Sequence, residues 1–106
     1  MADGPKPDAT TLAEPEATPQ PDPETKAKAE SLYRSGHELF REGQYEQAEV
    51  QLKQALGLYP FMAEANLVLG KVLLIRGAAA HDEVMLDSAR LMFKMALSID
   101  PRLREA

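Results

Sequence analysis

The chain contains one stretch of sequence twice, and this duplication limits the possible folds more than any other feature. Three residues recur 34 positions later: Gly36, Leu39 and Gly43 correspond to Gly70, Leu73 and Gly77. Five more recur 41 positions later: Tyr45, Ala48, Leu52, Ala55 and Pro60 correspond to Leu86, Ala89, Phe93, Ala96 and Pro101. The change of offset indicates two copies of one unit, the second with a seven-residue insertion at residues 78–84. A period in the thirties is typical of proteins built from stacked repeats.

Each unit has the pattern of two amphipathic helices. In the first copy, Leu32, Gly36 and Leu39 lie at helical spacing, and Gly43 follows as a residue suited to end a helix. The second helix is marked by Tyr45, Ala48, Leu52, Ala55 and Leu56. Small residues such as Gly36 and Ala48 would allow the two helix axes to approach closely, with larger side chains filling the space beside them. The sequence therefore predicts an all-α chain of antiparallel helical hairpins.

This pattern resembles the tetratricopeptide repeat (TPR) family over about residues 26–106. The matching residues are Gly36, Leu39, Ala48, Leu52, Ala55 and Pro60 in the first copy, and Leu69, Gly70, Leu73, Ala89, Phe93, Ala96 and Pro101 in the second. The sequence departs from the family at Leu32 and Asn66, where Trp is common. The resemblance implies a fragment of an α-solenoid with repeat one at about 26–60, repeat two at about 61–101 and a short helical stub at 101–106. It also implies that the first helix of each hairpin lines a concave groove.

The N-terminal part has a different composition from the rest. Residues 1–25 hold six of the eight prolines and six acidic residues against one lysine, which accounts for the whole net charge of −5. So little apolar surface cannot offset the entropy lost on ordering. We predict a disordered acidic, Pro-rich tail at residues 1–22, either a flexible arm or a solubilising leader, and a TPR-like domain at 23–106. Asp22, Pro23 and Glu24 have the pattern of a helix cap and first turn.

Composition argues against several functions. The chain has no cysteine, so thiolate metal sites and thiol nucleophiles are excluded. No apolar run suits membrane insertion, and residues 26–106 carry no net charge, which argues against nucleic acid. The tail lacks the basic start and apolar run of a targeting signal, so a cytoplasmic protein is expected.

Catalysis and metal binding also lack the necessary residues. His37 and His81 lie in different repeats, and no nucleophile–base set or phosphate-binding loop can be assembled. We therefore expect no enzymatic activity, no cofactor and no small-molecule substrate. Within the insertion, His81, Asp82 and Glu83 are consecutive and would point in different directions on a helix, so no metal site is expected. The insertion either lengthens the hairpin, with Asp82 as a cap, or forms a solvated loop.

Function is then expected at the surface, and the first hypothesis is a groove. Leu32, Leu39, Leu69 and Leu73 can supply a core, and other apolar residues on the groove-lining helices are surplus to it. The groove residues implied by the repeat register are Tyr33, His37, Phe40, Arg41, Leu67, Lys71, Leu74 and Ile75. This hypothesis gives an adaptor or scaffold that binds a peptide or helix of another protein.

The second hypothesis concerns the last helix. Two repeats are fewer than the three or more that such proteins usually stack, so an end can be left open. The residues proposed for such an end face are Val84, Met85, Leu91, Met92 and Met95. Leu103 could cover part of this surface; the rest could bind a second copy of the chain or another subunit of a larger assembly. The protein would then be a small assembly subunit.

Overall fold

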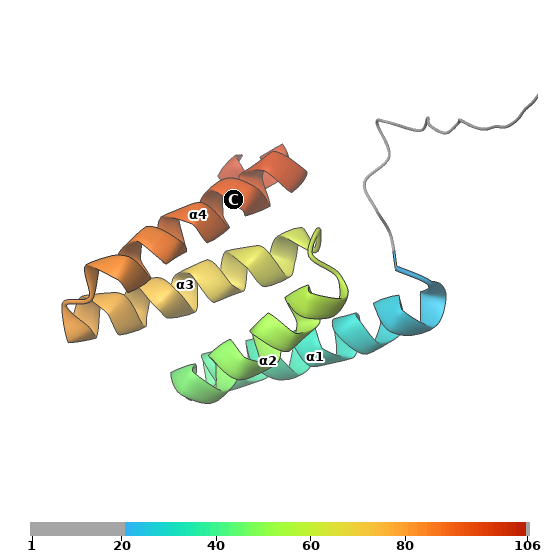
Figure 1. Ribbon diagram of the computed structural model, residues 1–106, viewed down its shortest axis with the longest axis horizontal. Helices are drawn as coiled ribbons and strands as arrows, with labels where there is room; N and C mark the ends of the chain where they lie inside the picture. The colour runs from blue at the N-terminus through green and yellow to red at the C-terminus, as the bar shows by residue number, and fades with distance from the viewer. Residues whose placement is uncertain (1–20, 106) are drawn as a thin grey trace, which may run out of the picture.

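The computed structural model describes residues 21–105, and this part of the chain is entirely helical (Figure 1). Its elements are α1 (Pro23–Arg41), α2 (Tyr45–Leu58), α3 (Ala63–Ala80), α4 (Glu83–Ile99) and the short 3-10 helix η2 (Pro101–Glu105). The described residues contain no strand, and the predicted all-α class is confirmed. The tail predicted for residues 1–22 lies, apart from Pro21 and Asp22, outside the described residues.

The four helices form two hairpins that lie side by side. Figure 1 shows α1 and α2 as one hairpin and α3 and α4 as the other, with α3 next to the first hairpin. α3 packs against α1, α2 and α4, and it contributes more buried residues than any other helix. The core is therefore organised around α3, and the first hairpin is held to the second mainly through contacts with that helix.

The ends of α1 follow from local sequence. The Asp22 carboxylate caps the helix by accepting a hydrogen bond from the Thr25 backbone N–H at 2.8 Å. Pro23 occupies the first turn, where its missing N–H costs nothing. At the other end, Gly43 has φ +83°, the left-handed conformation that allows the chain to leave a helix. These are the start and stop signals that the sequence predicts.

The insertion lengthens the second hairpin rather than forming a loop. Gly77 does not end its helix as its counterpart Gly43 does; α3 continues to Ala80 because the three alanines that follow are strong helix formers. His81 then turns the chain with a φ of 54°, and Asp82 caps α4 by accepting from the Met85 backbone N–H at 3.1 Å. The loop between α3 and α4 is thus only two residues long.

Glycines let the helices of each hairpin touch. A Cβ added at Gly36 would lie 2.8 Å from Cγ of Leu52, and one added at Gly70 would lie 2.8 Å from Cε1 of Phe93. Both distances are shorter than van der Waals contact allows, so each large side chain occupies the space that the glycine leaves. The same small–large contact occurs in both hairpins, as the repeated sequence predicts.

An ion-pair cluster ties the two hairpins together. Arg76 of α3 donates hydrogen bonds to Glu49 and, at 3.4 Å, to Glu46, both on α2. Lys53 lies 2.7 Å from the other Glu49 oxygen, and the Glu49 side chain is only 12% exposed. Burial raises the pKa of Glu49, but the hydrogen bonds from Lys53 and Arg76 outweigh it and hold the pKa below its usual range.

Replacing Glu49 by glutamine is expected to lower the free energy of unfolding at neutral pH by about 1 kcal/mol, because the partly buried Arg76 loses its main carboxylate partner. A carboxyl whose folded pKa is depressed stabilises above the unfolded pKa, and this stabilisation is lost as pH falls through the folded pKa. In urea denaturation, wild type and E49Q should therefore begin to converge as pH falls below the unfolded pKa of about 4.3, and should coincide below the depressed folded pKa of Glu49.

The matched control is Glu38→Gln, since within residues 21–105 Glu38 pairs only with Arg41 of the same helix, at 3.9 Å and largely in solvent. This variant should differ little from wild type. Equal stability of E49Q and wild type at neutral pH would contradict the role given to the Glu49–Arg76 pair.

Candidate protein-binding surfaces

The predicted groove residues on α1 form a half-buried aromatic row. The rings of Tyr33 and His37 stack with centroids 5.7 Å apart, and those of His37 and Phe40 with centroids 6.4 Å apart. Phe40 also lies 5.8 Å from the ring of Tyr45 on α2. Tyr33 and Phe40 pack against the buried core, so the assumption that they are surplus to it is wrong. Arg41, the last residue of α1, is exposed.

α1 contacts α3 as well as α2. Burial raises the pKa of Tyr33, and the nearby negative charge of Glu64 in the first turn of α3 raises it further. Tyr33 therefore lies close to the start of α3. The sequence pattern of one hairpin could not show that the next hairpin would partly cover its groove-lining residues.

The corresponding row on α3 is more open. Leu74, the counterpart of Phe40, is 46% exposed, and Ile75 is exposed beside it. Lys71 is exposed and Leu67 is half-buried. Among the described residues, only the short 3-10 helix η2 follows α4, and it contacts α4 but not α3, so these apolar side chains remain accessible.

The residues proposed for an end face do not form one surface. Met85 and Met92 pack against the core. Val84, Leu91 and Met95 are exposed and share one side of α4, since they lie seven and four residues apart. The five residues therefore divide between an inward-facing pair and an outward-facing row.

The repeat register points to apolar residues on α4 that the sequence analysis missed. Tyr45, Leu52 and Leu56 of α2 belong to or pack against the core, and Leu52 is completely buried. Their counterparts 41 positions later are Leu86, Phe93 and Leu97, all half-buried, and the two leucines lie outside that cluster. The offset of 41 residues was the signal that could have identified them. We call the following set the open side: Leu67, Leu74, Leu86, Phe93 and Leu97.

At the edge of the open side, the charge at one position is reversed relative to the first hairpin. Arg90 stands where α2 has Glu49, and Lys94 stands where it has Lys53. Arg90 pairs with Asp87 on its own helix, and the Arg90 side chain is 67% exposed. At the position of Glu49, α4 therefore presents a cation, whereas Asp87 keeps a carboxylate at the position of Glu46.

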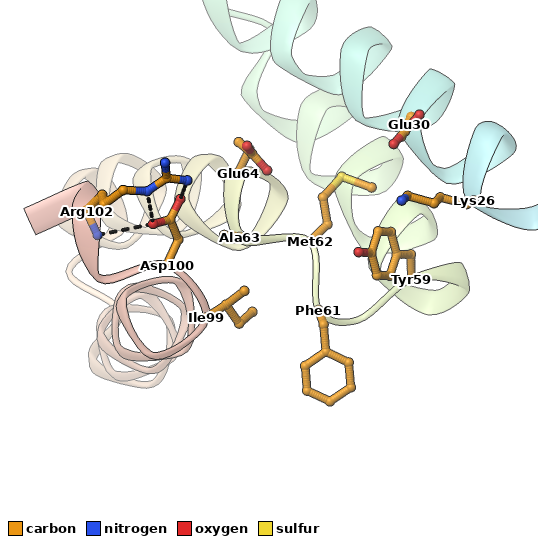
Figure 2. A pocket seen from close by; sticks show the side chains of 10 residues that line it. All are labelled: Lys26, Glu30, Tyr59, Phe61, Met62, Ala63, Glu64, Ile99, Asp100 and Arg102. Atoms are coloured by element: carbon orange, nitrogen blue, oxygen red, sulfur yellow. Dashed lines mark hydrogen bonds and ion pairs between the residues drawn. The ribbon is translucent and has the colours of Figure 1, made fainter. Parts of the chain in front are cut away.

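A separate cavity of about 360 Å³ lies where the start of α1, the α2–α3 connection and the end of α4 meet (Figure 2). Figure 2 shows Met62 between the Asp100–Arg102 pair on one side and Lys26 with Tyr59 on the other. Asp100 accepts from Arg102 Nε at 2.9 Å and from Nη2 at 3.0 Å. The Lys26 ammonium lies 5.8 Å from the centre of the Tyr59 ring.

Most of the lining charge of this cavity is already used in such pairs. Hydrogen bonding from Arg102 lowers the pKa of Asp100, which keeps that carboxyl ionised. Glu30 and Glu64 complete a lining that mixes both signs of charge. The arrangement contains no nucleophile with an adjacent base, and its mixed charge selects no ligand class.

Across residues 21–105, no three potential ligands are grouped to hold a metal ion, and no helix is long and apolar enough to cross a membrane. No protein-family model, curated protein or solved structure matches the chain.

Proposed function

We propose that this chain is a non-catalytic adaptor or scaffold protein of the TPR type that binds another polypeptide on its open side. The proposal includes a cytoplasmic location. The observation that carries it is the difference between equivalent positions: Leu52 is completely buried and Phe40 is half-buried against the core, whereas Phe93 is only half-buried and Leu74 is 46% exposed.

The same geometry already holds a helix elsewhere in the molecule. In the first hairpin, the residues equivalent to the open side belong to or pack against the core that the two hairpins share. This arrangement of side chains is therefore suited to packing against helices. Accessible leucine and phenylalanine side chains in one patch are also typical of protein-binding surfaces. The predicted groove also includes Leu67, Lys71, Leu74 and Ile75, so the groove hypothesis is kept on α3. The contribution of α1 to the groove is mainly His37 and Arg41.

A second candidate is a small assembly subunit that docks through the outward row of α4, namely Val84, Leu91 and Met95. It is supported by the strong exposure of these three apolar side chains. Because this row lies on the opposite side of α4 from Leu86, Phe93 and Leu97, the two candidates use different surfaces and can be tested separately.

A photo-crosslinking amino acid placed at Leu74, Leu91 or Val50 of the full chain tests both candidates in the native extract. Val50 is the matched control, because it is apolar and 53% exposed but lies outside both surfaces. We expect crosslinks to discrete partner proteins from Leu74 at several times the yield from Val50, and their loss when Phe93→Glu is added.

Circular dichroism of each variant establishes that the helices are intact. Crosslinks from Leu91 alone would favour the assembly subunit instead. Equal yields at all three positions would contradict both candidates.

A further inference from the structure

The packing of α3 on the first hairpin is the template for what can bind the open side. α3 directs a row of small and branched residues into the core that it shares with α1 and α2; they are Ala65, Val68, Leu69 and Val72. One turn further on, Arg76 reaches Glu49 and Glu46. Counted from Ala65, the helix carries apolar residues at i+3, i+4 and i+7 and a cation at i+11.

A helix that packed on α4 in the same way would meet the opposite charge at the position of Glu49, with Asp87 in place of Glu46. Its residue at i+11 would lie over Arg90 instead of Glu49, with Lys94 one turn away. A cation there would be repelled, and a carboxylate would be attracted. The Asp87 partner of Arg90 does not prevent this, because that pair is largely solvent-exposed and such pairs exchange at little cost.

We propose, on the basis of the function proposed above, that the open side binds an amphipathic α-helix of a partner protein whose apolar row at i, i+3, i+4 and i+7 is followed by a carboxylate at i+11. The helix lies antiparallel to α4, as α3 lies antiparallel to α2. The apolar row packs on Leu74, Phe93 and Leu97, and the carboxylate pairs with Arg90.

A second copy of this chain fits the open side poorly. Among residues 21–105, the one helix equivalent to α3 is α1, and its residues at the positions of the α3 row are polar and exposed. They are Ser31, Arg34, Ser35 and Glu38 in place of Ala65, Val68, Leu69 and Val72. Glu42 stands at the position of Arg76 and would suit Arg90, but docking would bury Arg34 and Glu38 without partners.

The probe is an 18-residue peptide with the α3 sequence, residues 63–80, carrying R76E. A hydrocarbon staple between the outward positions of Leu67 and Leu74 keeps the peptide helical. The matched peptide retains Arg76. Binding of each fluorescein-labelled peptide to the full chain, and to its R90E variant, is measured by fluorescence anisotropy. Arg34→Glu, at an exposed arginine on the outer side of α1, is the control for a change of net charge.

We expect the R76E peptide to bind wild type roughly ten-fold more tightly than the Arg76 peptide, and R90E to reverse this order. Arg34→Glu should leave the order unchanged. Backbone chemical shifts should change at Leu86, Phe93 and Leu97. Circular dichroism of R90E establishes that the variant is folded; if it is not, Arg90→Gln should abolish the preference instead.

Binding of neither peptide, or equal affinities that ignore residue 90, would overturn the inference. So would sedimentation of the full chain alone as a dimer that Phe93→Glu dissociates, because the occupant would then be a second copy. Crosslinking from Leu74 separates the failure of this inference from the failure of the proposed function. If a partner is crosslinked but the peptides show no preference, only the proposal of an acidic helix is refuted. If no partner is crosslinked, the proposed adaptor function is refuted as well.

Discussion

Replacing Gly36 by alanine is expected to lower the free energy of unfolding by about 2 kcal/mol, although alanine is the better helix former by about 1 kcal/mol. The added Cβ would lie 2.8 Å from Cγ of Leu52 and 3.3 Å from Cβ of Gln51. Leu52 is completely buried and has no free space to move into, so the helices of the first hairpin must separate. For a domain of this size, with a stability of about 5–10 kcal/mol, the loss is large.

Two other glycines provide matched controls in the same urea denaturation series. An added Cβ at Gly70 meets the ring of Phe93, which is half-buried at the open side and can turn outward, so Gly70→Ala should cost less than G36A. At Gly57 nothing lies within 4 Å, and Gly57→Ala should stabilise α2 by about 0.5 kcal/mol. If G36A were as stable as Gly57→Ala, the close contact between α1 and α2 would be refuted.

Replacing Asn66 by aspartate is expected to lower the free energy of unfolding by about 3 kcal/mol at neutral pH. Asn66 is only 3% exposed, and its amide nitrogen donates to the backbone oxygens of Pro60 at 3.1 Å and Met62 at 3.0 Å. These bonds fix the connection between the hairpins. Aspartate removes both donors and places a negative charge against two carbonyl oxygens. Asn66→Ala loses the bonds without adding the charge and should cost about 1–2 kcal/mol.

The two variants are distinguished by their pH dependence. Burial and the facing carbonyl oxygens should raise the pKa of the introduced carboxyl above its unfolded value. A raised folded pKa means that the folded state binds the proton more tightly, so the stability of N66D falls as pH rises. We expect its deficit relative to Asn66→Ala to shrink towards about pH 4 in urea denaturation. A constant difference between the two variants across this range would contradict the proposed environment.

Much of the fold follows from short-range sequence signals. Asp22 directly precedes α1, and Gly43 lies two residues after its last residue, Arg41. Both signals could be read from the sequence because capping and left-handed turns depend only on neighbouring backbone. The hairpins follow from the repeated positions of glycine and the large residues that face them. The outcome at the insertion could not be predicted in this way, because the continuation of α3 past Gly77 is accompanied by packing of Leu86 against that glycine.

The candidate surface was predictable only in part. The register correctly placed Leu74 and Ile75 on the accessible side of α3, because the direction of these side chains follows from their positions along that helix alone. It misjudged Tyr33 and Phe40, which pack against a core built from both hairpins. The sequence shows that Arg90 corresponds to Glu49. That this change of charge affects which helix can bind follows only from the structure, in which Glu49 accepts a hydrogen bond from Arg76.

The polar outer side of α1 sets the stoichiometry of any complex formed through the opposite end. Proteins that add subunits head to tail grow without limit when each new member offers the surface that the previous one used. Here the two ends do not match, because Arg34 and Glu38 occupy the positions that would have to be apolar. Under the proposed function, association at the open side is therefore expected to stop after one step: one chain binds one helix, and no filament forms.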